Sequence, residues 1–229
     1  MLYNDEFLFL HYPKTAGKSV SVHFCQNFTK PIYGLVSPGQ FQEINMQYDQ
    51  GVFLEHGRGH ENLKQAKTLL SEKGIDIYKL RAIFVVARNP YALIVSNYNF
   101  LRNAYKANPA MRSKKNFQLA ALNNFKTFCH EYNPACFSKW IELDGVKPPN
   151  LHLIYFDDLA NNLSNFLALN GVVEEYPLLH LNKSSSHHSD TAIDEECKQL
   201  IDQKFHHLFR LGNYKKELKT MNTLIGMTC

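Results

Sequence analysis

Short apolar runs alternate with amphipathic stretches along most of the chain. Four runs are brief, rich in aromatic and β-branched residues and bounded by turn residues, which predicts strands over 6–11, 51–56, 82–87 and 151–156. The run at 82–87 is apolar throughout, as is typical of a strand covered on both faces. The pattern therefore predicts a sheet buried between two layers.

Helical periodicity follows each of these runs. Leu63, Ala66 and Leu70 share one face of a predicted helix over 61–73, and Gly74 marks its end. Strands that alternate with helices form βαβ units. We therefore expect an α/β fold, with three α/β/α layers around a central, mainly parallel sheet. No repeat or long linker divides the chain, so residues 1–229 are expected to form one domain. The other predicted helices cover about 17–25, 91–105, 117–132, the stretch after Asp157, and about 193–209.

Composition narrows the class of protein. A hydrophobic share of 45% and a charged share of 20% are those of a globular domain, and a net charge of +4 favours an anionic ligand without requiring nucleic acid. Five scattered cysteines without a CxxC pair indicate reduced thiols in a cytoplasmic protein and no zinc site. No signal peptide or apolar run of about 18 residues is present, so we expect no integral membrane segment; a trimmed anchor is the alternative.

The loop after the first predicted strand collects groups that bind anions. It reads Pro13-Lys14-Thr15-Ala16-Gly17-Lys18-Ser19 and leads into a predicted helix. Backbone N–H groups converge at a helix N-terminus, and the lysines and hydroxyls add charge and further donors. A Walker A loop would need a glycine where Tyr12 stands, five residues before Gly17. We expect an anion site here; an ordinary βα turn with solvated lysines is the alternative.

A second candidate for anion binding follows the third predicted strand. Arg88 stands at the strand's carboxyl end, and Ser96 lies eight residues further on, about two turns along the next predicted helix. A guanidinium and a hydroxyl suit a terminal phosphate. The alternative is that Arg88 caps a neighbouring element and Ser96 packs in the core. In an open parallel sheet this loop and the first would meet at one edge.

These two loops together resemble those of sulfotransferases that use 3′-phosphoadenosine-5′-phosphosulfate (PAPS). The run His11 to Ser19 is similar to the family's 5′-phosphosulfate loop, and Phe84 to Tyr98 is similar to its 3′-phosphate motif. Residues 153–159 and 209–214 extend the likeness, the latter toward the carbohydrate-type branch. The resemblance covers about three quarters of the chain in order and spacing. It implies a P-loop-like fold and sulfuryl transfer of the EC 2.8.2 type, with PAP as the nucleotide product and no metal.

The same resemblance implies roles for individual residues. Lys14 would contact the bridging oxygen and steady the leaving phosphate, while Arg88 and Ser96 would bind the 3′-phosphate. Lys183 and Ser184 could close over that phosphate, with a plain solvated loop as the alternative. In the family the residue after the loop glycine varies, so Lys18 could instead point to solvent. The residues implied to hold the 5′-phosphosulfate are Pro13, Lys14, Thr15, Ala16, Gly17, Lys18 and Ser19.

Sulfuryl transfer also needs a base, which the loop after the second predicted strand could supply. Histidine suits the role because its usual pKa lies near neutrality. The family places a histidine or glutamate in this loop, so His56 is the first candidate, His60 the second and Glu55 the third. Glu55 alternates with His56 along the strand and is expected to face away. A histidine that only satisfies a hydrogen bond at the strand end is the alternative.

The sequence also allows expectations about the acceptor, and it leaves two alternative functions open. The acceptor would be a small molecule or a carbohydrate, chosen by loops such as 31–50 and 102–116, and nucleic acid is not expected. The basic stretch 102–115 is expected to be loop-like, and it either meets an anionic acceptor or is a solvated face.

A P-loop nucleotide kinase is one alternative function. It would need magnesium held by an acidic residue at the end of a strand, but Arg88 stands at that position. A non-catalytic nucleotide-binding module is the remaining alternative.

Overall fold

The computed structural model describes residues 1–37, 51–179, 181 and 192–216. Its strands are β1 (Leu2–Tyr3), β2 (Phe7–Leu10), β3 (Ile32–Val36), β4 (Val52–His56), β5 (Ala82–Ala87) and β6 (Leu151–Tyr155). Its helices are α1 (Gly17–Asn27), α3 (Leu63–Glu72), α4 (Pro90–Ala107), α5 (Lys115–Leu122), α6 (Phe125–Glu131), α7 (Ser138–Ile141), α8 (Leu159–Leu169), α9 (Glu195–Lys204) and α10 (His206–Leu211), with a 3-10 turn η1 (Pro109–Met111).

The strands form one six-stranded sheet in the order β4-β3-β1-β2-β5-β6. Parallel pairing joins β2 to β5, β3 to β4 and β5 to β6. The short β1 is antiparallel to both of its neighbours. The predicted α/β fold with a mainly parallel sheet is therefore confirmed.

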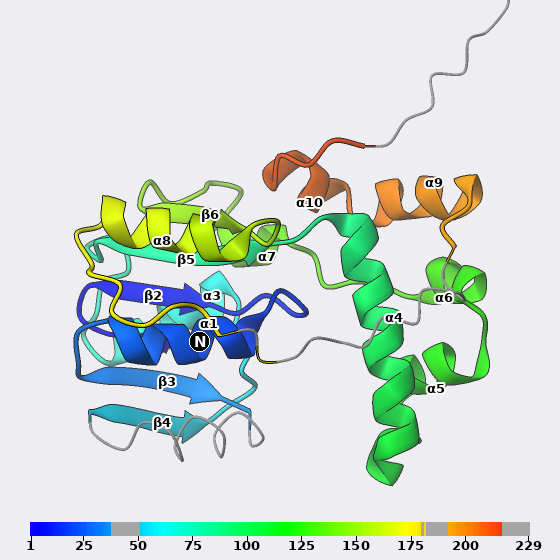
Figure 1. Cartoon of the computed structure of the whole chain (residues 1–229), viewed down its shortest axis with the longest axis horizontal. Coiled ribbons are helices and arrows are strands. Elements are labelled where there is room, and N and C mark those ends of the chain that lie inside the picture. The colour runs from blue at the N-terminus through cyan, green and yellow to red at the C-terminus, as the bar shows by residue number, and fades with distance from the viewer. Residues whose placement is uncertain (38–50, 180, 182–191, 217–229) are drawn as a thin grey trace, which may run out of the picture.

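Alternation along the central strands divides the core into two layers. Phe84 and Val86 of β5 face the layer that contains α1 and α8, whereas Ile83 and Val85 face the layer that contains α3 and α7. All four side chains are buried. Figure 1 shows α1 and α8 in front of the sheet and α3 behind it, which gives the three predicted layers.

A separate group of helices lies beyond the carboxyl ends of the strands. In Figure 1 the strand arrows point toward α4, which runs across this end of the sheet beside α5, α6 and α9. Contacts join α4 to α5 and α9, and α6 to α9. Loops leaving β2 and β5 therefore emerge between the sheet and α4, and these are the two loops for which the sequence predicts anion binding.

Several predicted elements differ from the observed ones. The predicted helix over 117–132 is broken between α5 and α6, because the Asn124 side chain accepts from the Thr127 N–H (2.9 Å) and begins a new helix. The basic stretch 102–115 was predicted to be loop-like, but it contains the end of α4 and the turn η1. The acceptor loop predicted over 31–50 contains β3, and residues 38–50 lie outside the described part.

Three further observations concern the described residues only. No helix among them is both long and apolar enough to span a bilayer. Their cysteines, at positions 25, 129, 136 and 197, form no disulfide. No three of their His, Cys, Asp or Glu side chains gather in a way that could hold a metal ion.

Truncating Phe84 should destabilise the protein strongly. Its buried ring packs against Phe9 (5.1 Å between centroids) and Phe166 (4.8 Å), so Phe84→Ala opens a cavity in the layer under α1 and α8. We expect a loss of about 3–5 kcal/mol in the free energy of unfolding, measured by urea denaturation. Phe53→Ala on the edge strand β4 is the control: that side chain is 56% exposed, and its loss should cost about 1 kcal/mol or less. Equal losses in the two variants would contradict the layer assignment.

Candidate functional site

The two predicted anion loops meet at the carboxyl edge of the sheet. Because β2 and β5 pair in parallel, with Leu10 opposite Val85, the residues that follow them leave the sheet side by side. The Arg88 guanidinium donates a hydrogen bond from Nη1 to the carbonyl oxygen of Lys14 at 3.1 Å. Residues 74 positions apart in the chain are thereby joined in one site.

The loop before α1 is tightly wound. Lys14 and Ala16 both adopt left-handed backbone conformations, with φ of 65° and 60°. Between them the buried Thr15 hydroxyl donates to the carbonyl oxygen of Tyr12 at 2.7 Å. Helix α1 then begins at Gly17 with no side-chain cap and no acidic residue in its first turn. Its first N–H groups are therefore not neutralised locally, which is the arrangement that binds anions.

Close packing explains the glycine at the start of α1. A Cβ atom at Gly17 would lie 1.8 Å from Nε2 of His11, a ring that is itself buried. The loop can approach the end of β2 only because no side chain is present there. The following Ser19 is also buried, and its Oγ accepts from the Leu181 N–H at 3.1 Å.

Positive charge is concentrated around Lys14. Burial, together with the nearby charges of Arg88 and Lys18, lowers the pKa of this half-buried amine from 10.5 to about 8. Its Nζ lies 4.0 Å from the centroid of the Phe100 ring, over the aromatic face. Bringing like charges together in a partly buried site is unfavourable unless an anion joins them, so the site is suited to a multiply charged anion.

Arg88 is held by stacking and burial. Its guanidinium lies 4.1 Å from the Phe156 ring centroid, and burial lowers its pKa while Asp157 acts in the opposite direction. The Arg88 Nε is buried and has no hydrogen-bond partner among the described residues. A buried donor without a partner is costly and is a common mark of a ligand site.

The predicted partner of Arg88 lies on the facing helix. Ser96 is half-buried on α4, whose start is capped by the Asn89 side chain accepting from the Tyr91 N–H at 2.9 Å. Residues four apart share a helix face, so Ser96 lies on the same face as Phe100, which contacts Lys14. Ser96 therefore belongs to the face of α4 from which Phe100 reaches the Lys14 side chain. Lys183 and Ser184 lie outside the described residues.

The two candidate histidines occupy different places. His56 ends β4, the edge strand, and β3 and β1 separate β4 from β2, so the two strands are about 14 Å apart. His60 instead reaches back to the end of β2: its ring centroid lies 4.3 Å from that of His11. Its Nδ1 lies 3.1 Å from the His11 carbonyl oxygen. The structure thus brings His60, and not His56, against the loop that carries Lys14.

The contact with His11 also determines the protonation pattern of His60. A carbonyl oxygen can only accept, so Nδ1 of His60 carries the proton and Nε2 presents a lone pair when the ring is neutral. The His60 ring keeps an exposed face, and partial burial lowers its pKa, with the Lys14 charge acting in the same direction. The lowered pKa favours the neutral form of the His60 ring near pH 7. The buried Glu61 orders this loop by accepting from the Arg58 N–H at 3.0 Å.

Two aromatic residues of the site were not predicted from sequence. Phe100 supports Lys14, and Phe156 supports Arg88. The first could have been found, because Phe100 follows Ser96 at helical spacing. Phe156 directly follows β6, the neighbour of β5, but the order of strands in the sheet is needed to see that it reaches Arg88.

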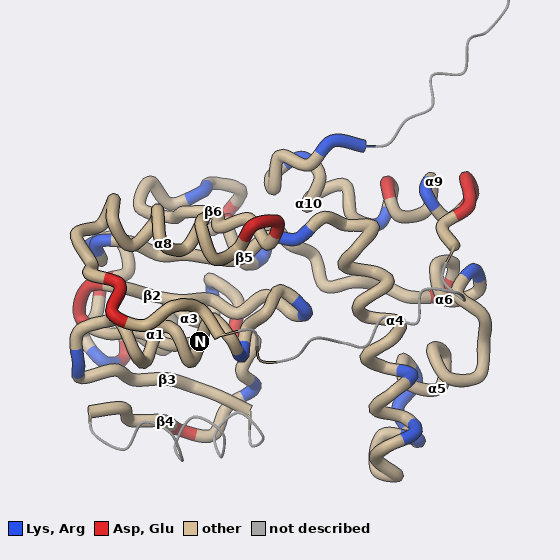
Figure 2. Tube along the Cα trace, viewed as in Figure 1, with Lys and Arg blue, Asp and Glu red and all other residues tan. Residues whose placement is uncertain are grey.

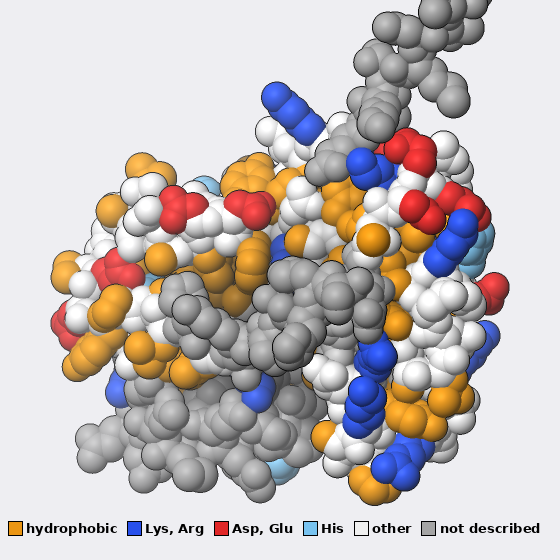
Figure 3. Space-filling view, turned by 45° about the vertical axis from the view of Figure 1, so that its right-hand side comes forward, with side chains coloured by type: hydrophobic (Ala, Val, Ile, Leu, Met, Phe, Trp, Pro, Cys, Tyr) orange, Lys and Arg blue, Asp and Glu red, His pale blue; other side chains and the backbone are white. Residues whose placement is uncertain are grey.

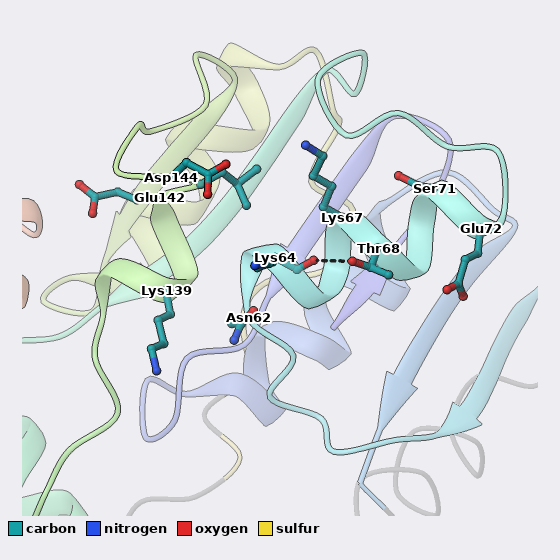
Figure 4. A pocket seen from close by; sticks show the side chains of 10 residues that line it. Asn62, Lys64, Lys67, Thr68, Ser71, Glu72, Lys139, Glu142 and Asp144 are labelled. Carbon is teal, nitrogen blue, oxygen red and sulfur yellow. Dashed lines mark hydrogen bonds between the residues drawn. The ribbon is translucent and has the colours of Figure 1, made fainter.

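A separate hollow lies between α3 and the α7 region. Its volume is about 860 Å³, and its lining mixes lysines with acids. Figure 4 shows these side chains around the opening, with the Thr68 hydroxyl bonded to the Lys64 carbonyl (3.2 Å). None of the predicted site residues lines it. Its lining residues are Asn62, Lys64, Lys67, Thr68, Ser71, Glu72, Lys139, Glu142, Leu143 and Asp144.

Comparison with known proteins adds a remote likeness to a solved structure. No model of a protein family matches the chain, and no curated protein sequence matches it. Among solved structures, the crystal structure of a sulfotransferase from Alicyclobacillus acidocaldarius aligns with 93% of this chain and 97% of its own, at a TM-score of 0.42 and 10% sequence identity.

The pKa of Lys14 should respond to its charged neighbours. Removing one cation in Arg88→Ala should raise it from about 8 toward the usual 10.5, without reaching that value because burial is the largest cause. Sulfate binding should raise it too, since an anion favours the charged amine. A ¹³C NMR titration of the lysine ε-carbons measures this, with Lys14→Arg assigning the signal. Arg81→Ala, which removes an arginine bound to Glu6, is the control and should have no effect. A Lys14 pKa unchanged in Arg88→Ala would contradict the assignment.

Proposed function

We propose that the chain transfers a sulfuryl group from PAPS to a hydroxyl or amine of an acceptor. The observation that carries the proposal is the meeting of Lys14, Arg88 and the uncapped start of α1 beside a neutral histidine. The first three can hold a nucleotide with phosphates at two positions, and the histidine can take a proton. The resemblance of the loops 11–19 and 84–98 to those of PAPS-dependent sulfotransferases supports the same function.

In this proposal the loop before α1 binds the 5′-phosphosulfate. The N–H groups of Gly17, Lys18 and Ser19 face the anion, and Lys14 lies beside the bridging oxygen. Arg88 and Ser96 bind the 3′-phosphate, for which the buried Arg88 Nε is an available donor. PAPS supplies a sulfuryl group on a phosphate leaving group.

His60 and Lys14 then act on opposite sides of the transferred group. His60 Nε2 takes the proton of the acceptor hydroxyl as its oxygen bonds to sulfur. The bond from sulfur to the bridging oxygen breaks, and Lys14 stabilises the negative charge left on the phosphate. Because His60 lies against the end of β2, we place it before His56 as the base, the reverse of the order that the sequence favours.

Binding should distinguish the 3′-phosphorylated nucleotide from its analogues. We expect the native protein to bind PAP more tightly than adenosine 5′-phosphate, and Arg88→Ala to weaken PAP binding by about 10- to 150-fold, as for loss of a charge-assisted hydrogen bond. Isothermal titration measures both affinities. Arg81→Ala is again the control, because Arg81 immediately precedes β5 but donates to Glu6 and Asn170.

Three results would overturn the assignment of the nucleotide. Equal affinity of the native protein for PAP and adenosine 5′-phosphate would remove the proposed 3′-phosphate site. Tighter binding of ATP with magnesium than of PAP would favour the kinase alternative. Transfer activity that disappears in EDTA and returns with magnesium would point the same way.

Turnover should depend on His60 and not on His56. General-base catalysis contributes about 10²–10⁴ in rate, so His60→Ala should lower kcat by that factor while PAP affinity stays unchanged. In the native enzyme kcat should rise with pH through a pKa below 6.5 and then level off, because only the neutral ring accepts a proton and the His60 pKa is lowered. A transfer assay on His60→Ala and His56→Ala measures the difference. Loss of turnover in His56→Ala alone would move the base to the edge strand.

A further inference from the structure

An acidic turn lies beside the proposed 3′-phosphate site. Asp157 and Asp158 follow β6, which pairs in parallel with β5 and therefore ends next to Arg88. Both aspartates are exposed. Figure 2 shows this turn in red next to a blue position beyond β5, and Figure 3 shows acidic side chains at the surface over the end of β6. A carboxylate in this place repels a bound phosphate and is itself a good partner for an arginine.

Asp157 nevertheless forms no ion pair with Arg88. Burial lowers the pKa of the Arg88 guanidinium, and the nearby charge of Asp157 acts in the opposite direction. Within the described part of the chain, however, no ion pair joins the two side chains. The buried Arg88 Nε also has no hydrogen-bond partner there, although a carboxylate lies in its neighbourhood. A third group is therefore needed to hold the carboxylate away from the guanidinium.

The hydroxyl of Tyr214 is in the right place to be that group. It donates to the carbonyl oxygen of Ala87, the last residue of β5, at 2.9 Å. It also hydrogen-bonds the Asp157 carboxylate. Burial raises the pKa of this phenol, and the charge of Asp157 and the hydrogen bond to it act in the same direction. The phenol therefore keeps its proton near pH 7 and binds the carboxylate as a donor.

The turn after α10 fixes the position of Tyr214. The Tyr214 N–H donates to the carbonyl oxygen of Phe209 at 3.1 Å, and Asn213 allows this turn by adopting a left-handed conformation with a φ of 53°. The Tyr214 ring packs edge-on against Tyr155 of β6, with 5.8 Å between centroids and 83° between planes. The hydroxyl thus reaches the ends of β5 and β6 from a segment that is distant in the sequence.

We propose that Tyr214 is a positioning residue for the nucleotide site: its hydroxyl binds the Asp157 carboxylate and so keeps Arg88 available to the 3′-phosphate. This inference rests on the proposed function, because the 3′-phosphate of PAPS is the group that needs the guanidinium. Without the hydroxyl, the Asp157 carboxylate turns to Arg88 and competes with the phosphate for the same donors. Tyr214 acts only through these two side chains and does not touch the reacting atoms.

Nucleotide selectivity tests the role of the hydroxyl. Tyr214→Phe keeps the ring that packs against Tyr155 and removes only the hydroxyl. We expect the Kd for PAP to rise about 3- to 10-fold, as for the loss of one hydrogen bond. The Kd for adenosine 5′-phosphate should stay unchanged, because that nucleotide has no 3′-phosphate. Isothermal titration measures both. Equal weakening for the two nucleotides would indicate a general structural role and overturn the inference.

Removing the Asp157 charge should rescue the variant. When Tyr214→Phe is combined with Asp157→Asn, no carboxylate competes for Arg88, so PAP affinity should return at least to the native value. Asp158→Asn is the matched control, because it removes the neighbouring charge, which accepts instead from the Asn161 side chain at 2.9 Å. It should leave the Tyr214→Phe defect in place. Failure of Asp157→Asn to rescue, or equal rescue by Asp158→Asn, would contradict the proposed role.

The single variant Asp157→Asn approaches the same question without changing Tyr214. It should bind PAP at least as tightly as the native protein does, since a charge that repels the phosphate is gone. Weaker PAP binding would show that the carboxylate supports Arg88, and this would overturn the inference.

The native protein separates the inference from the function beneath it. If it prefers PAP to adenosine 5′-phosphate and Tyr214→Phe keeps that preference, the 3′-phosphate site stands and the role of Tyr214 is wrong. If the native protein shows no such preference, the proposed 3′-phosphate site fails and the inference fails with it.

Discussion

The hydrogen bond from Arg88 to the Lys14 carbonyl is the contact on which the rest of the site depends. It exists because β2 and β5 are parallel neighbours, so their carboxyl ends lie side by side. The donor is a cation, and the acceptor is the backbone of a residue whose side chain is also a cation. The sheet thus holds the cationic side chains of Arg88 and Lys14 at one edge, although they repel each other. A bound anion would relieve that repulsion.

Packing in the core maintains the strained backbone of the loop before α1. Left-handed backbone at Lys14 and Ala16 costs roughly 1–2 kcal/mol for each residue. The loop keeps that conformation because its surroundings are rigid: Tyr12 packs against the rings of Phe137 (5.1 Å) and Trp140 (5.0 Å), and its hydroxyl donates to Ala135. Strain supported in this way is a mark of functional loops in general.

Sequence pattern predicted the class of fold and the first two loops, because both depend on local signals. The apolar run 82–87 and the cluster of small, basic and hydroxyl residues after Pro13 need no tertiary information. Strand β3 was not predicted from the sequence, because Pro31 precedes it, Gly34 interrupts it and only its alternate positions are buried. The distance of His56 from β2 could not be predicted from the sequence either, since chain order does not show that β3 and β1 lie between β4 and β2.

The position of His60 follows from the same topology. Strand β4 lies at the edge, so the chain must return toward β2 before it can enter α3, and the loop 57–62 makes that return across the carboxyl end of the sheet. Gly59 has a φ of 73°, a conformation that favours glycine, and is buried where the loop passes His11. The next residue therefore meets the backbone at the end of β2, and the His11 carbonyl orients its ring. A histidine at the end of β4 itself has no such path, because the return begins only after it. Of the two histidines, the one on the returning loop is thus the one that lies against the end of β2.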